Sequence, residues 1–217
     1  MSNSVCPVSG ETSSEEALNH ITHLLGCVLS IAGAACLIVF SSLYGNVWTI
    51  VSSSIFSFTL VLLYAASTIY HGSKNLRLKR FFKVIDHSCI YILIAGTYTP
   101  ITLGILRGFE GWTLFGIEWG IAILGISWKI YNVNGSELFS TIAYLIMGWL
   151  IIFSWPAVVA VVPYSAIVLI VAGGLSYSFG TIFFMWGSLP YNHGIWHFFV
   201  LGGSACHYFA ILNTVIT

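Results

Sequence analysis

Long apolar runs separated by short polar segments dominate the chain. Residues 24–70 contain no charged residue and no histidine, so this run holds two membrane spans of about 20 residues, which separate near residues 41–46. Five further spans follow by the same criterion. The third begins near Val84 and fades over 99–107, and the fourth covers 111–131. The long stretch 138–192 divides at Trp155, Pro156 and Pro163 into the fifth and the sixth. The seventh runs from about 193 to 216.

Seven such spans occupy roughly 140 positions, which leaves short loops and no room for a separate soluble domain. The predicted fold is therefore all-α, a single bundle of seven transmembrane helices over residues 16–217. A disordered polar tail is expected over residues 1–15. The tail holds Glu11 and Glu15 but no lysine or arginine, so it lacks the basic start of a secretory signal.

The composition agrees with a membrane protein and excludes a nucleic-acid partner. Hydrophobic residues make up 58% of the 217 positions and charged residues only 6%, and the mean hydropathy is +0.93. Seven basic residues balance seven acidic ones, so no net field attracts nucleic acid. The five cysteines are scattered without a CxxC pair, and we expect them to be small core residues.

The distribution of basic residues predicts the orientation of the bundle. Placing the basic segment 74–83 inside also places Lys129 inside and leaves Arg107 as the outside basic residue. The N-terminus is then cytoplasmic and the C-terminus external. We expect a multi-pass protein of the cytoplasmic membrane, in contact with membrane lipids.

This topology brings polar residues that are distant in sequence to one depth on the cytoplasmic side. His71 ends the second span, Asp86 begins the third, and His193 and His197 begin the seventh. The spacing of four residues puts His193 and His197 on one helical face, which suits two ligands of one metal ion, and His71 would complete a set of three.

Three neutral imidazoles leave a fourth tetrahedral position for water, which is typical of a catalytic zinc site, and Asp86 would hold that water. Ser67 lies one turn before His71 and could bind a ligand or water, although serines in membrane helices often bond to their own carbonyls. Any single one of these histidines is more simply read as a helix-end or interface residue. The alternative that the zinc ion is only structural and links the helices stays open.

Glu16, Asn19 and His23 share this layer at the start of the first span. We expect them to contact the metal-binding residues without binding the metal themselves, or to be ordinary residues of a helix start.

Other polar residues fit this site less well. His207 is ten residues beyond His197, about 15 Å farther along the helix, and is left out. His20 and His87 are weaker candidates, and Glu118, an acid within the fourth span, has no assigned role.

The polar residues fall into sequence blocks that resemble the hemolysin III family, the bacterial branch of the progestin and adipoQ receptor (PAQR) family of seven-helix membrane proteins. The resemblance covers nearly the whole chain from Glu15 onward. The matching blocks are Glu16-x2-Asn19-x2-Thr22-His23, Ser67-x3-His71, the run from Asp86 to Pro100, and His193-x3-His197 followed by His207-Tyr208.

The resemblance implies a cytoplasmic-side zinc ion bound by His71, His193 and His197, with Asp86 holding a zinc-bound water. It implies two different functions. The family looks related to alkaline ceramidases, and its eukaryotic receptors are associated with ceramide hydrolysis. Its bacterial name records a membrane-lytic or pore-forming activity.

The residues and the resemblance together favour a zinc-dependent hydrolase of a ceramide-like lipid amide or ester, with a role in membrane lipid homeostasis. Asp86 would take a proton from water and Ser67 would steady the oxyanion. The alternative is a non-enzymatic pore-former, or a membrane sensor with structural zinc, of unknown oligomeric state. A retinal protein is excluded because no lysine follows Lys129, and an intramembrane serine protease has little support at Gly202-Gly203-Ser204.

Overall fold

The computed structural model describes residues 5–217, and helices occupy most of that range. Seven helical units among these residues are long and apolar enough to cross a membrane, with α3 and η1 forming one span and α5, η2 and α6 another. This confirms the predicted seven-helix multi-pass membrane protein.

The elements are α1 (Ser13–Tyr44), α2 (Val47–Gly72), α3 (Leu76–Thr99), the π-helix η1 (Pro100–Leu106), α4 (Gly108–Tyr131), α5 (Glu137–Trp149), the 3-10 helix η2 (Leu150–Ser154), α6 (Trp155–Val161), α7 (Tyr164–Met185) and α8 (Asn192–Ile216).

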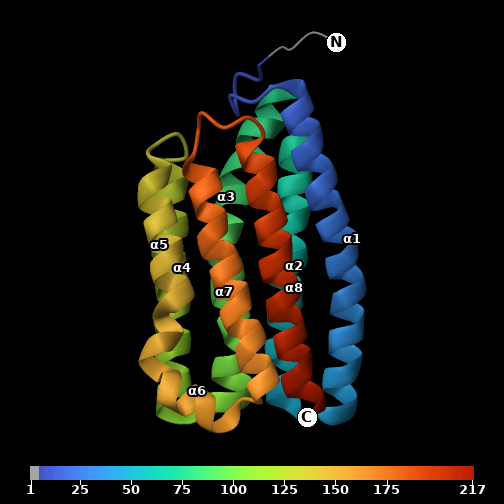
Figure 1. Ribbon diagram of the computed structural model, residues 1–217, viewed down its shortest axis with the longest axis vertical. Coiled ribbons are helices and arrows are strands. Elements are labelled where there is room, and N and C mark those ends of the chain that lie inside the picture. Colours follow the sequence, from blue (N-terminus) through green and yellow to red (C-terminus); the bar gives the residue numbers. More distant parts are fainter. Residues whose placement is uncertain (1–4) are drawn as a thin grey trace.

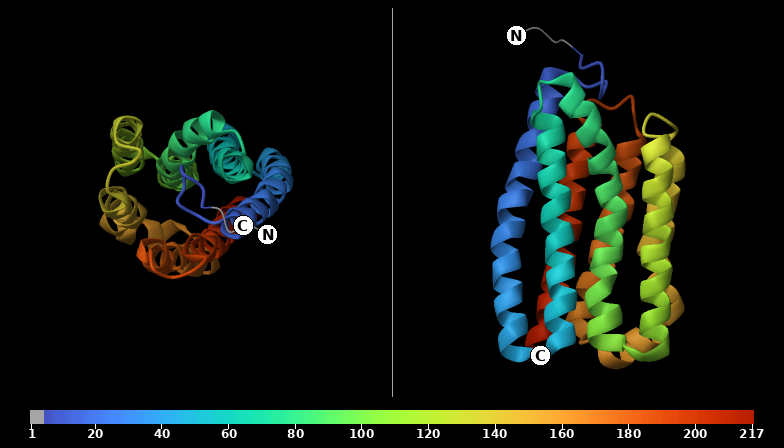
Figure 2. Two further views of the ribbon diagram at one scale, coloured as in Figure 1. Left: turned by 90° about the horizontal axis from the view of Figure 1, so that it is seen from above. Right: turned by 180° about the vertical axis from the view of Figure 1, so that it is seen from behind.

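The helices stand side by side, and the described N-terminal residues and the C-terminus lie at opposite ends of the bundle (Figure 1). Seen from above, they follow one another around a ring in which α8 returns to the side of α1 (Figure 2). The α1–α2, α2–α3 and α7–α8 pairs pack along their lengths. An apolar core that includes Leu37, Phe56 and Val200 fills the space between α1, α2, α3 and α8.

Three helices begin at capping residues that hydropathy does not detect. Thr12 and Glu15 form a reciprocal capping box at the start of α1, and Asn46 caps α2. Asn75 accepts hydrogen bonds from the backbone of Arg77 and Leu78, so α3 begins at Leu76 and not near Val84. The basic segment that the sequence places in a loop therefore forms the first turns of α3.

The third span ends within the predicted range 99–107, whereas the predicted division at Trp155 and Pro156 differs from the structure. At Pro100, which lacks a backbone N–H, α3 continues as a π-helix and extends the third span to Leu106. Pro156 lies in the first turn of α6, where proline is tolerated, so the fifth and sixth spans separate only at Pro163.

The N-terminal residues differ from the predicted disordered tail. Residues 1–4 lie outside the described part of the chain, and residues 13–15 belong to α1. Residues 5–12, here called the N-terminal strap, are folded back by a bridge between Val5 and Thr12 and by the Cys6 N–H bonding to the Glu11 carbonyl. The strap lies over the end of the bundle where α2 ends and α3 and α8 begin (Figure 1).

Candidate metal centre

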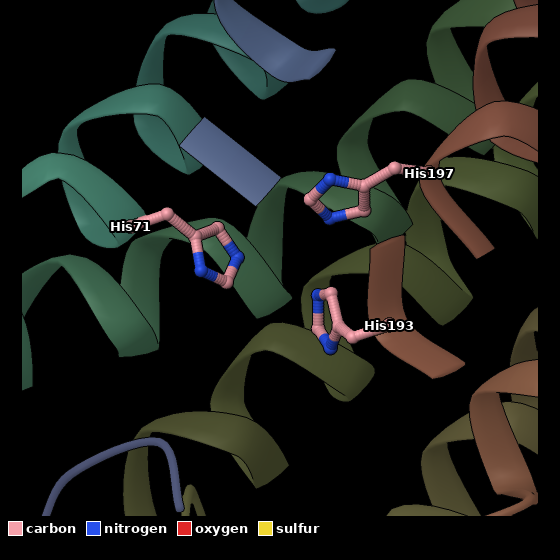
Figure 3. A group of neighbouring side chains, drawn as sticks. All are labelled: His71, His193 and His197. Atoms are coloured by element: carbon pink, nitrogen blue, oxygen red, sulfur yellow. The ribbon is translucent and has the colours of Figure 1, made fainter. Parts of the chain in front are cut away.

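Three histidines from two helices converge at the end of the bundle beneath the strap. His71 lies in the last turn of α2, and His193 and His197 lie in the first turns of α8. Each offers one ring nitrogen within 4.8 Å of those of the other two. Their rings face a common space, with centroids 4.7 Å apart for His193 and His197 (Figure 3). The structure therefore brings together the three predicted ligands.

The Nδ1 atom of each of these histidines has a polar neighbour from the beginning of the chain. Glu16 Oε2 lies 2.8 Å from Nδ1 of His71, and Glu11 Oε1 lies 3.4 Å from Nδ1 of His193. Thr22 Oγ1 lies 3.0 Å from Nδ1 of His197. Such outer contacts fix the orientation and the tautomer of metal-binding histidines.

The Thr22 contact determines which nitrogen of His197 carries the proton. The Thr22 hydroxyl lies 3.0 Å from the carbonyls of Leu18 and Asn19, and carbonyls only accept, so the hydroxyl donates to them. A hydroxyl that gives its one proton to these carbonyls accepts a hydrogen bond from Nδ1–H of His197. This assignment leaves Nε2 of the neutral ring with a free lone pair, the form that binds a metal ion.

The residues present fit a bound cation. Nε2 of His71 is buried and has no hydrogen-bond partner in the described part of the chain, although an unpaired buried acceptor costs free energy. A cation among the three histidines would satisfy that atom, and neutral imidazoles are common zinc ligands. The carboxylate of Glu16, next to His71, adds a negative potential that attracts a cation.

A second group of three also meets the distance requirement, namely Glu11, Glu16 and His71. Its oxygens are already engaged, because Glu16 Oε1 binds Lys79 and Glu11 Oε2 accepts a 2.6 Å hydrogen bond from Asn19. The group of three histidines is therefore the better candidate.

Lys79 is a site residue that sequence reasoning missed. Its side chain is 1% exposed, and its ammonium donates to Glu16 Oε1 at 2.8 Å and to the Tyr70 carbonyl at 2.9 Å. The sequence placed Lys79 in a basic loop. With α3 beginning at Leu76, Lys79 lies seven residues before Asp86 and therefore on the same interior face of the helix.

Glu11, in the strap, was also missed. Burial, together with the negative charges of Glu16 and Glu15, raises the pKa of Glu11 to about 8. The strap is held in place because Lys83 donates to the Val8 carbonyl at 3.2 Å and Ser9 donates to Glu16. No spacing rule points to Glu11, because it precedes the first span and its position depends on how the strap folds back.

Asp86 and Ser67 lie beside the histidines and not among the grouped ligands. Both line a cavity of about 110 Å³ that His193 and His197 also line. The Ser67 hydroxyl is buried, and it interacts with the Asp86 carboxyl. Their predicted roles, as proton acceptor and oxyanion donor, stay predictions.

The remaining candidates occupy defined positions around this cluster. His23 stacks on His197 with ring centroids 3.4 Å apart, and neither of its buried ring nitrogens has a hydrogen-bond partner among the described residues. His87 points away, to Glu137 at 3.5 Å. His20 contacts the Thr68 carbonyl, and Glu118, although 0% exposed, lies in α4 apart from the cluster.

A larger, mainly apolar cavity of about 510 Å³ adjoins the smaller one. Residues such as Thr97, Trp149 and His207 line both, so the two cavities share a wall. The lining of the larger cavity includes Ile152, which is exposed on the outside of the bundle. The cavity beside the histidine cluster thus neighbours a larger apolar cavity, whose lining includes a residue exposed on the outside of the bundle.

Residues 12–208 match the protein family described as "Haemolysin-III related". The chain belongs to the haemolysin III family. It is 46% identical to the hemolysin-3 homolog of Bacillus subtilis (strain 168) over 93% of this chain and 94% of the relative. It is 45% identical to hemolysin-3 of Bacillus cereus over 93% and 92%. No solved structure matches the chain.

The haemolysin III assignment confirms the resemblance found in the sequence. The human monocyte to macrophage differentiation factor is 31% identical over 91% of this chain and 83% of its own length, which supports the placement in the PAQR branch. The region that matches the haemolysin III family contains the three histidines, Asp86 and Ser67. Glu11 precedes that region by one residue.

Proposed function

We propose that this haemolysin III family protein is a zinc-dependent hydrolase of a lipid amide or ester. One observation carries the proposal. Three histidines with oriented Nδ1 atoms meet beside a cavity that Asp86 and Ser67 also line, and this cavity adjoins an apolar one. His71, His193 and His197 would hold Zn2+. Asp86 and Ser67 are the catalytic candidates.

When bound, the ion would act as a Lewis acid that polarises a carbonyl group and makes water a stronger acid. In this proposal the Asp86 carboxylate accepts the proton of the attacking water and delivers it to the leaving amine or alkoxide. In this proposal the Ser67 hydroxyl, which is buried next to the Asp86 carboxyl, donates to the oxygen on which negative charge develops. Glu16, Thr22 and Glu11 keep the imidazoles in one orientation.

The cavities support a lipid as the substrate. A scissile amide or ester at the histidine cluster would leave its apolar chain in the larger cavity, which has the volume of a typical ligand site. Access from the bilayer through the side of the bundle avoids passage through water. A ceramide-like lipid, and a role in membrane lipid homeostasis, follow from this arrangement and from the family resemblance.

The histidine cluster would lie at the cytoplasmic side of the membrane. Lys74, Arg77 and Arg80 are exposed at the same end of the bundle, whereas Arg107 lies at the other end. Basic residues are enriched in cytoplasmic segments of membrane proteins, which supports a cytoplasmic N-terminus.

The proposal is tested first by metal content. Mass spectrometry of the detergent-purified protein should find about one zinc per chain, lost in the His193→Ala/His197→Ala double variant. Ceramide turnover should then disappear on chelation and in Asp86→Ala, while Asp86→Ala keeps its zinc. A folded wild-type protein without metal, or turnover that survives both treatments, would refute the proposal.

A second candidate function is a cytolytic or pore-forming protein, or a membrane sensor, in which zinc is only structural. The names of the two Bacillus relatives, a hemolysin-3 homolog and hemolysin-3, favour it. Dye release from liposomes by the purified protein, unchanged in His193→Ala, would support this function over hydrolysis.

A further inference from the structure

The first two turns of α3 carry an exposed basic face. Arg77 and Arg80 are exposed on the helix, and Lys74 is exposed just before it. With about 3.6 residues per turn, Arg77, Arg80 and Phe81 lie within roughly 100° of one another around the helix axis. Lys79 lies on the opposite side and is buried. The same turns therefore face the bundle through Lys79 and face outward through two guanidinium groups.

The three exposed cations have no counter-charge within the described chain. None of them forms an ion pair in residues 5–217. Acids at the same end of the bundle have other partners. Glu16 pairs with the buried Lys79, and Glu137 pairs with the buried Lys129. Glu15 accepts hydrogen bonds from two backbone N–H groups. A group of exposed like charges without a counter-charge attracts anions from outside the protein.

The length of α3 places this face at the depth of lipid head groups. The span formed by α3 and η1 has 31 residues. At about 1.5 Å per residue it is roughly 45 Å long, whereas the hydrocarbon core of a bilayer is about 30 Å thick. Arg107 follows the other end of the span, and its guanidinium lies 4.8 Å from the ring centroid of Trp48, a residue type enriched at membrane interfaces. With Arg107 in one head-group layer, Arg77 and Arg80 reach the opposite layer.

Apolar side chains next to the two arginines are exposed as well. Phe81 is 61% exposed, Leu78 44% and Leu76 40%. In a bilayer these groups lie against acyl chains, while the longer arginine side chains extend to the phosphate layer. A free phosphate ion would contact only the charges, whereas a phospholipid contacts both the charges and the apolar surface. The combination favours a lipid as the partner.

We propose that the first two turns of α3 form a binding surface for anionic phospholipids, whose head groups contact Arg77 and Arg80, with Lys74 alongside. Guanidinium groups form paired hydrogen bonds with phosphate oxygens. The ammonium of a zwitterionic head group cancels much of the attraction, so the surface selects head groups with a net negative charge. These residues do not line the two cavities. Lipid binding here therefore does not depend on hydrolysis at the metal centre.

Native mass spectrometry of the full-length protein, purified in a nonionic detergent, tests the proposal. Phosphatidylglycerol is the anionic probe and phosphatidylcholine the zwitterionic one. We expect phosphatidylglycerol to bind about 30-fold more tightly, and a higher concentration of ammonium acetate should reduce this difference. Equal binding of the two lipids would overturn the proposal. Displacement of phosphatidylglycerol by an equal concentration of inorganic phosphate would also overturn it, because the surface would then bind the free anion.

Two variants and a control assign the preference to this face. Arg77→Gln should reduce the preference for phosphatidylglycerol about fivefold, and Arg77→Gln/Arg80→Gln about 30-fold. Arg107→Gln is the matched control, because it removes one exposed charge at the other end of the same span, and the preference should persist. A preference that survives in the double variant, or that falls as far in Arg107→Gln as in Arg77→Gln, would contradict the assignment.

The comparison of the two lipids on the wild type needs no variant, so it tests the proposal even where the double variant does not fold. The His193→Ala/His197→Ala variant, which lacks two candidate metal ligands, should keep the preference for phosphatidylglycerol. Failure of the hydrolase proposal leaves that preference unchanged. Equal binding of the two lipids leaves the zinc content unchanged, so the two failures give different results.

Discussion

The ammonium of Lys79 lies 2.8 Å from the carboxylate of Glu16, inside the bundle and next to the histidine cluster. The other oxygen of Glu16 holds His71 at 2.8 Å. One carboxylate from α1 thus connects a cation of α3 with a candidate ligand of α2. The metal centre and the packing of these three helices depend on the same ion pair.

Lys79→Met should destabilise the protein, because it leaves the Glu16 carboxylate without its buried partner. Removal of one member of a buried pair costs about 3 kcal/mol or more. The thermal unfolding temperature in detergent measures this effect. Lys74→Met, at an exposed position of the same basic segment, is the control and should change the temperature little. Similar unfolding temperatures for the two variants would show that the ion pair is not important for stability.

Glu16→Ala should weaken zinc binding by roughly 10- to 100-fold, the usual effect of removing a carboxylate that orients a histidine ligand. Glu16→Gln should lose less, because an amide oxygen can still accept from Nδ1–H of His71. Competition with a chelator of known affinity gives both values. Glu110→Gln, an exposed acid at the other end of the bundle, should bind zinc as the wild type does.

Thr22→Val should lower zinc affinity up to about tenfold, since it keeps the shape of the side chain but removes the oxygen that fixes the tautomer of His197. Thr68→Val is a matched control, because the Thr68 hydroxyl donates only to its own helix, at the Tyr64 carbonyl. Equal affinities of the two variants would argue that the Thr22 contact does not orient His197.

Glu11→Ala should speed the transfer of bound zinc to a chelator, because the strap then loses its contacts with His193 and Asn19. Ser9→Ala separates two explanations. If the strap acts as a cover, loss of the Ser9 contact with Glu16 should also speed the transfer. If only the Glu11 carboxylate matters, Ser9→Ala should behave as the wild type. Unchanged rates in both variants would exclude a role for the strap.

His23→Phe should keep its zinc, because His23 meets His197 through ring stacking and not through a nitrogen atom. His23→Ala should lower stability by about 2 kcal/mol, since it leaves a void against His197. Metal content and unfolding temperature, measured on both variants, distinguish a packing residue from a ligand. Loss of zinc in His23→Phe would show that His23 binds the ion.

Hydropathy was sufficient to predict the spans, because bilayer thickness sets the length of an apolar run. It was not sufficient for their ends. Asn75 starts α3 in a basic segment, and Pro100 and Pro156 are accommodated inside spans by local changes of helix type. These outcomes depend on individual caps and turns, which a hydrophobicity average does not contain.

The three histidines could be predicted from the sequence. Topology places the span ends at a common depth, and spacing places His193 and His197 on one helical face. The residues that orient them were harder to find. The contacts of Thr22 and Lys79 depend on how their helices are rotated about their axes, and the contact of Glu11 depends on the path of the strap. Contacts that cross between elements depend on packing and not on local sequence.

The strap and α1 are synthesised first and α8 last, yet the histidine cluster needs all three. Glu11 and Thr22 come from the beginning of the chain, and His193 and His197 come from its final helix. During biosynthesis the cluster therefore stays incomplete until the last span has been inserted and has docked against the first. Metal uptake by this cluster would report that the whole bundle has been assembled, and a truncated chain would remain empty.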